Sequence, residues 1–135
     1  PSIMKLELIE NLVVREFQND FTIPVRTQEN VYQRAIYYRI CREFTTKSLK
    51  DIGYSIGRDH ATVLHGMKLF KNFELWGEDK LLDSYSRIRN KVQKKKEKEY
   101  RAAYNRKQTY KLLLNQYINL KEKNYKLKQS LQKFS

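Results

Sequence analysis

The residues that could do chemistry in this chain of 135 amino acids are two histidines, one cysteine and a polar cluster around His60. His60 and His65 are five residues apart, or roughly 140° around a helix, so one face cannot offer both to a metal ion. Cys41 has no histidine near it in sequence, and a buried structural thiol is the commoner role. The chain also has no glycine-rich loop ending in Gly-Lys-Ser or Gly-Lys-Thr that would bind ATP. We therefore expect no enzyme activity, metal, cofactor or bound nucleotide.

The polar cluster lies within residues 48–70, which read as two short helices joined by a tight turn. Ser48 is suited to cap the first helix, with Asp51 three residues further on as in a capping box. The helix is predicted to run from Ser48 to about Ile56. Gly57 then supplies a backbone that can adopt the left-handed conformation of a turn. This layout is typical of a helix-turn-helix.

The second helix is predicted to begin at Asp59, whose carboxylate can accept a hydrogen bond from the amide of Thr62. Four apolar residues at helical spacing are expected to face inward: Val63, Leu64, Met67 and Phe70. The first turn holds the small and polar residues that a recognition helix needs at base edges: Arg58, Asp59, His60, Ala61 and Thr62. The pattern therefore predicts a helix that enters the major groove of DNA.

Residues 57–66, GRDHATVLHG, closely resemble the signature of the C-terminal DNA-binding domain of DnaA, the bacterial chromosomal replication initiator. Residues 33–53 are similar to the preceding helix and to the entry of that motif, and the resemblance covers roughly residues 24–73. Two positions depart from the family pattern. The turn has one glycine, Gly57, where the family usually has two, and Ala61 replaces the first of two threonines.

The resemblance implies sequence-specific binding of double-stranded DNA, in replication or its regulation, by a stand-alone module without the ATPase of the initiator. Such a module would fit a protein encoded by a phage or a plasmid. By resemblance, His60 and Thr62 contact bases with Ala61 beside them, Asp59 caps the helix and touches the groove, and Arg26 enters the minor groove. The same resemblance assigns phosphate contacts to four residues: Arg34, Ser48, His65 and Lys68.

The charge of the chain also favours a polyanionic partner. The formal net charge is +13, but residues 1–77 hold 11 Lys and Arg against 9 Asp and Glu, whereas residues 78–135 hold 17 against 6. The recognition region is thus nearly neutral, and the basic charge lies in the tail. One cysteine suits a reducing compartment, and no apolar run is long enough to cross a membrane. We expect a cytoplasmic protein that does not bind membranes.

The remaining pattern predicts an all-α fold with two parts. An amphipathic helix is expected over residues 3–17, a connector over 21–26 and a further helix over 31–44, with one apolar face. Residues 1–76 would form the helix-turn-helix domain, and residues 77–135 a long basic helical tail. No glycine or proline interrupts residues 79–134.

The end of the tail carries a heptad repeat from about residue 110. Its a positions are Tyr110, Tyr117, Asn124 and Leu131, and its d positions are Leu113, Leu120, Leu127 and Phe134. This pattern predicts a coiled coil and a homo-oligomer formed through residues 110–134. The alternative is that the apolar stripe folds back on the first helix of the same chain.

A second reading of function comes from the tail alone. The chain could be a structural or assembly protein whose basic coiled coil binds nucleic acid non-specifically, with the helix-turn-helix retained only as a fold. Base specificity separates the two readings, because the first requires a strong preference for one short duplex and the second requires none.

Overall fold

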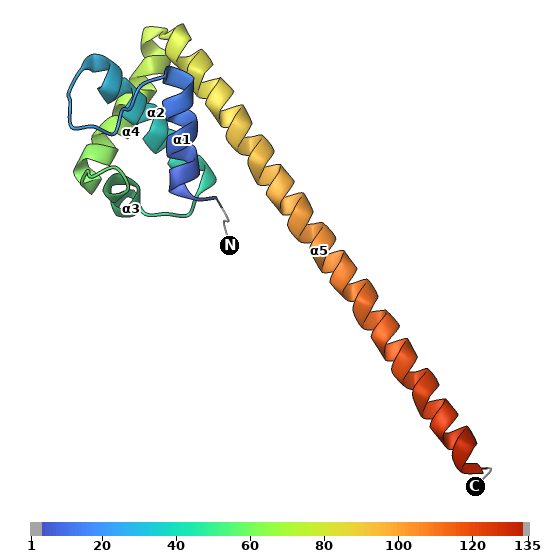
Figure 1. Cartoon of the computed structure of the whole chain (residues 1–135). Helices are drawn as coiled ribbons and strands as arrows, with labels where there is room; N and C mark the ends of the chain where they lie inside the picture. Colours follow the sequence, from blue (N-terminus) through green and yellow to red (C-terminus); the bar gives the residue numbers. More distant parts are fainter. Residues whose placement is uncertain (1–3, 134–135) are drawn as a thin grey trace. The chain divides into compact units, whose positions relative to one another are not determined.

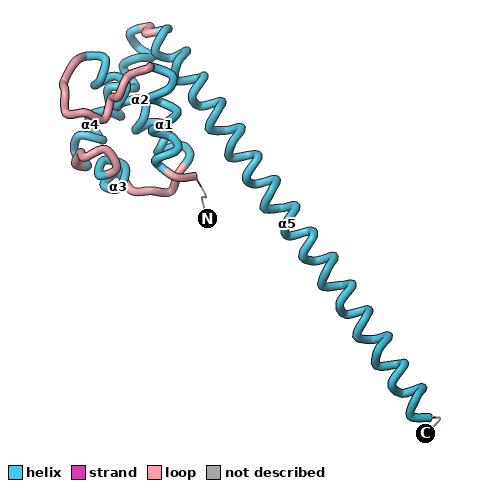
Figure 2. The backbone as a smooth tube through the Cα atoms, viewed as in Figure 1, coloured by secondary structure: helices cyan, strands magenta, loops and turns pink. Residues whose placement is uncertain are grey.

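A computed structural model describes residues 4–133, and within that range the regular structure is entirely α-helical (Figures 1 and 2). The predicted all-α fold is confirmed. The helices are α1 (Leu6–Phe17), α2 (Gln28–Phe44), α3 (Leu49–Tyr54), α4 (His60–Trp76) and α5 (Asp79–Lys133). The chain divides into two compact units, one ending at Lys96 and the other beginning at Glu97.

Helix α2 is the centre of the first unit. Its buried residues are spread around most of the helix: Asn30, Gln33, Arg34, Ala35, Ile36, Tyr37, Tyr38, Ile40, Cys41 and Phe44. The prediction of a single apolar face was therefore too narrow, because α1, α3 and α4 all pack against this helix. Helix α2 also begins three residues before the expected Val31. The side chain of Thr27 accepts a hydrogen bond from the Asn30 amide at 3.2 Å and so fixes the earlier start.

Helix α1 covers α2 and is tied to its first turn by polar side chains. The Asn19 side chain donates to Asn30 Oδ1 at 2.6 Å and to Gln33 Oε1 at 2.9 Å, which satisfies two largely buried amides. Helix α1 was expected to start at Ile3, which lies outside the described residues.

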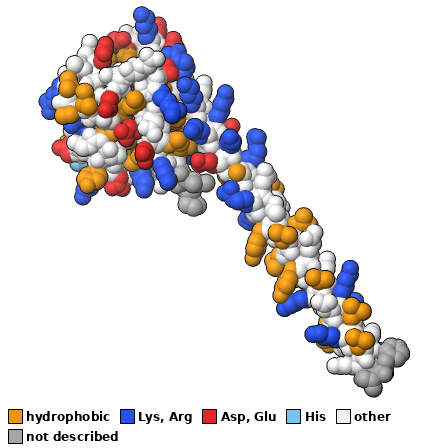
Figure 3. All heavy atoms as spheres, viewed as in Figure 1, with side chains coloured by type: hydrophobic (Ala, Val, Ile, Leu, Met, Phe, Trp, Pro, Cys, Tyr) orange, Lys and Arg blue, Asp and Glu red, His pale blue; other side chains and the backbone are white. Residues whose placement is uncertain are grey.

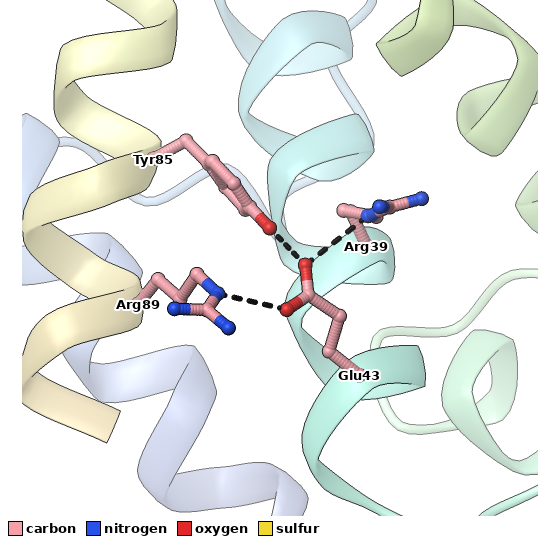
Figure 4. Close-up of polar contacts among 4 residues, drawn as sticks. All are labelled: Arg39, Glu43, Tyr85 and Arg89. Atoms are coloured by element: carbon pink, nitrogen blue, oxygen red, sulfur yellow. Dashed lines mark hydrogen bonds and ion pairs between the residues drawn. The ribbon is translucent and has the colours of Figure 1, made fainter. Parts of the chain in front are cut away.

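The first turns of α5 belong to the same packed unit. Ile88 and Val92 are fully buried, and the ring of Tyr85 meets that of Phe70 at 4.8 Å between centroids. Nearby, Glu43 of α2 accepts hydrogen bonds from Arg39, Tyr85 and Arg89 (Figure 4). The packed unit thus continues to Lys96, past the boundary that the sequence suggested after residue 76. The division into functional domains after residue 76 stays a prediction.

The second unit, as far as the structure describes it, is the remainder of α5. The a and d side chains of the heptad repeat are all exposed between residues 110 and 133, with leucines at 58–70%. Figure 3 shows apolar side chains gathered along this segment with lysine and arginine beside them. Phe134 of the repeat lies outside the described residues. Among residues 4–133, every helix is too short or too polar to cross a membrane.

Candidate nucleic-acid interface

The segment from α3 to α4 has the serine cap and the left-handed glycine that the sequence predicted. Ser48 Oγ accepts from the amide of Asp51 at 3.1 Å, and Gly57 has a φ of +71°, the left-handed conformation. Helix α3 ends at Tyr54, two residues before the expected Ile56. A second glycine is needed here for space. A Cβ on Gly53 would lie 2.7 Å from the carbonyl oxygen of Arg58 and 2.9 Å from that of Asp59.

Asp59 caps α4 as predicted and also holds the side chain of Thr62. Its Oδ1 accepts from the Thr62 amide at 2.8 Å and from the Thr62 hydroxyl at 2.7 Å. Both hydrogen bonds lower the pKa of Asp59, the one from the Thr62 hydroxyl more than the one from the Thr62 amide. The carboxylate therefore keeps its charge at the positive end of the helix. The Thr62 hydroxyl proton is thereby used within the protein, and its oxygen remains an acceptor for an outside donor.

The outer face of α4 is formed by five exposed residues that cover an arc of roughly 140° at 100° per residue. They are His60, Ala61, Leu64, His65 and Lys68. The prediction that Leu64 faces inward was wrong, since its side chain is 40% exposed. The face that packs on α2 is centred on Gly66 instead, where the backbone comes close to the neighbouring helix. Leu64 is therefore a member of the outer face that sequence reasoning missed.

A hollow of about 650 Å³ opens where the connector, α2 and the first turns of α4 meet. Seven of the ten predicted contact residues line it: Arg26, Arg34, Arg58, Asp59, Ala61, Thr62 and His65. Ser48, His60 and Lys68 are exposed but do not line the hollow. The fold thus brings together most of the residues singled out from sequence, although their contacts with DNA stay predictions.

Arg34 has a structural role that the sequence did not reveal. Its side chain is only 5% exposed and donates to three carbonyl oxygens of the connector, from Phe21 at 2.8 Å, Ile23 at 2.6 Å and Val25 at 2.9 Å. These bonds hold the connector that carries Arg26 against α2. The phosphate contact implied for Arg34 stays a prediction, and only part of its guanidinium is left for it.

Positive charge accumulates at the hollow because Arg26, Arg34 and Arg58 all line it. Burial lowers the pKa of Arg34, and the charges of Arg58 and Arg26 lower it further. Arg58 also donates to the Ile23 carbonyl, at 3.5 Å. Like charges held together in this way repel, and an anion placed among them would relieve that repulsion.

Sequence reasoning also missed Tyr38 and Gly66, both of which line the hollow. The phenol oxygen of Tyr38 is buried and has no hydrogen-bond partner within the described structure. A Cβ on Gly66 would lie 2.6 Å from Cδ2 of the Tyr38 ring. One signal was present in the sequence. A glycine inside a helix costs about 1 kcal/mol relative to alanine, which suggests a packing reason for its presence.

The thiol of Cys41 is buried, and burial raises its pKa, as expected for a structural cysteine rather than a nucleophile. Across residues 4–133, no three histidine, cysteine or acidic side chains are grouped so that they could hold a metal ion.

Comparison with known proteins gives one family match. Residues 6–69 match the family described as the bacterial dnaA protein helix-turn-helix. Chromosomal replication initiator protein DnaA of Wolbachia pipientis wMel is 36% identical over 80 residues, which cover 58% of this chain and 16% of that protein. The protein of the same name from Deinococcus deserti is 30% identical over 110 residues, or 76% of this chain and 23% of the relative. This chain therefore spans less than a quarter of the length of either relative.

Proposed function

Because residues 6–69 belong to the family of the bacterial DnaA helix-turn-helix, we propose that this chain binds double-stranded DNA at a preferred sequence. The observation that carries the proposal is the outer face of α4. It begins at a first turn that Asp59 caps, and its residues from His60 to Lys68 are exposed over about two and a half turns. A helix with such a face fits the major groove, which is about 12 Å wide.

In this arrangement the first turns of α4 read the bases. His60 can hydrogen-bond to base edges, Thr62 can accept from a base amino group, and the Ala61 methyl can meet a thymine methyl. Leu64 lies between His60 and Lys68 on the exposed arc and would add a second apolar contact of that kind. Because Ala61 lacks a hydroxyl, we expect the preferred site to tolerate change at the base pair that faces it.

Contacts to the backbone would orient α4 in the groove. Arg26 is carried on the connector that Arg34 holds in place, and it would reach the minor groove next to the site. Ser48 is exposed at the start of α3, and His65 and Lys68 are exposed on the outer face of α4. We expect all three to contact phosphates. Such contacts set the register and orientation of a protein on DNA but carry no sequence information themselves.

The biological setting is proposed from the relatives, which are named as chromosomal replication initiators. We infer that this chain serves replication or its regulation by binding sites of the same class. A protein encoded by a phage or a plasmid would fit that role.

We also propose that the protein forms a homo-oligomer through residues 110–134. The a and d side chains of this segment repeat every seven residues, and those between residues 110 and 133 are exposed. Such a stripe on a single helix needs a partner. Asn124 at an a position would pair with its counterpart and set the register. In a parallel pair, Lys123 of one helix would lie near Lys128 of the other. The lysines would repel, so added salt or a bound polyanion should strengthen the association.

The rival function is non-specific binding through the tail, and it is favoured by the excess of 11 positive charges in residues 78–135. Selection of bound duplexes from a random pool separates the two. Recovery of one short motif by the full chain supports the first proposal. If the recovered pool stays random while binding remains strong and salt-dependent, binding is non-specific, as the rival function requires.

A further inference from the structure

The phenol of Tyr38 is a polar group buried without a partner. Its side chain is 1% exposed, and the oxygen makes no hydrogen bond within the described residues. The neighbouring Tyr37 is equally buried, yet its hydroxyl bonds to Ser55 Oγ at 2.7 Å. Native proteins satisfy most buried hydroxyls, so the one on Tyr38 calls for an explanation.

Packing does not account for the hydroxyl. The Tyr38 ring fills the space against Gly66, and the ring carbons make that contact. A phenylalanine would fill the same space and leave no buried donor. The hydroxyl therefore destabilises the unbound protein, and it adds no packing contact that would offset this cost.

The surroundings of the phenol indicate what would satisfy it. Burial raises its pKa, so it keeps its proton and acts as a donor. The charges of Arg34 and Arg58 lower this pKa, and the charge of Asp59 raises it. All four residues line the hollow. A neutral donor beside two guanidinium groups is complementary to an anion with several acceptor oxygens.

We propose that this hollow binds one phosphate of the DNA backbone, and that Tyr38 donates its phenolic hydrogen to a phosphate oxygen. The inference rests on the proposed DNA binding and adds a residue to it. The phenol oxygen is closed to solvent in the unbound protein, so a lining side chain must move to admit the phosphate. Arg58 is the best suited, because it is half-buried and held by a hydrogen bond of 3.5 Å. Once displaced, it would pair with the same phosphate.

The test begins with Tyr38→Phe in the full chain, measured for both stability and DNA affinity. The variant should unfold at the same denaturant concentration as wild type or a higher one, because it loses an unsatisfied hydroxyl. It should bind DNA about tenfold more weakly, as expected for the loss of one hydrogen bond to a charged group. Selected and random duplexes should weaken by the same factor, since a phosphate contact carries no sequence information.

Tyr37→Phe is the matched control, because it removes a phenol that already has a protein partner. It should lower stability and leave DNA affinity unchanged. Unchanged affinity in Tyr38→Phe, with wild type still preferring its selected duplex, would overturn the phosphate contact and leave the proposed function standing. If instead wild type prefers no duplex but Tyr38→Phe weakens binding to all of them, the contact stands and sequence specificity fails.

A second arm identifies the source of the phosphate. Duplexes that carry one neutral methylphosphonate linkage each are scanned along the site with both proteins. At one linkage the neutral group should weaken binding by the wild type but should not weaken binding by Tyr38→Phe any further, because both changes remove the same bond. Additive losses at every linkage would overturn the assignment. Inorganic phosphate that raises the unfolding temperature of wild type but not of Tyr38→Phe, with equal duplex affinities, would make free phosphate the ligand instead of DNA.

Discussion

Gly66 of α4 lies so close to the Tyr38 ring of α2 that a Cβ built on it would be 2.6 Å from Cδ2 and 2.8 Å from Cε2. The Tyr38 ring is buried at this contact, and the backbone of α4 comes close to α2 there. The contact sets which side of α4 faces the core, and hence which side carries His60, Leu64 and Lys68 outward. Gly66 thus helps to determine which side chains form the outer face of α4.

Gly66→Ala is expected to destabilise the protein, even though alanine is the better helix former. The added methyl must displace a buried ring, which typically costs about 1–3 kcal/mol. Denaturant unfolding measures the change. The double variant Tyr38→Leu with Gly66→Ala should recover much of the loss, because the smaller side chain makes room. Equal stability of Gly66→Ala and wild type would mean that the ring moves freely and does not fix α4.

The combined substitution His60→Ala and Thr62→Ala should remove site preference while leaving weak general binding. Each base contact contributes about 1–3 kcal/mol of discrimination, whereas the positive charge of the tail is unchanged. The measurement is the ratio of affinities for the selected and random duplexes. Asn11→Ala, an exposed change on α1, is the control. A double variant that keeps the wild-type ratio would show that bases are read elsewhere.

Arg34→Lys tests the role of this side chain in holding the connector. Lysine keeps the charge but lacks the planar group that donates to three carbonyls, so buried acceptors lose partners. We expect a loss of about 1–3 kcal/mol in stability. Affinity should fall as well, because Arg26 is no longer held. The control is Arg15→Lys on the exposed side of α1. If only affinity falls, the main role of Arg34 is contact with DNA.

How far the sequence could predict the interface depends on the range of the interactions. Ser48 and Asp59 cap residues three positions away, and Gly57 acts through its own backbone, so these caps and this turn could be predicted from types and spacing alone. Arg34 and Tyr38 could not be understood in this way. Their partners are a connector 9–13 residues upstream and a glycine on another helix. Tertiary packing also decided that Leu64 faces outward, although its spacing suited the core.

Stability should decrease in acid through Asp59. Its pKa is lowered in the folded protein by the bonds from Thr62, so its contribution is full above the unfolded pKa of about 4. The contribution is lost as the pH falls through the lower folded pKa. Asp59→Asn keeps an acceptor for the cap and should remove this component of the pH dependence. Unfolding curves between neutral pH and about pH 3 measure it, and identical pH profiles for the two proteins would contradict the assignment.

The tail provides the last prediction, which concerns oligomeric state. Sedimentation of the full chain should give a dimer or larger species, and Leu113→Ser with Leu120→Ser should give a monomer, since both leucines are exposed d positions. The cut that isolates the DNA-binding part belongs after Lys96, because Ile88 and Val92 are buried in the packed unit. That shorter chain should be monomeric and select the same motif with lower affinity, because pairing two sites can raise avidity by about 10²–10⁴.

The repulsion between Lys123 of one helix and Lys128 of the other makes the response of self-association to salt diagnostic. Self-association should strengthen with salt while DNA binding weakens. A full chain that stays monomeric at every salt concentration, with the leucine variant identical to it, would mean that the stripe packs within one chain.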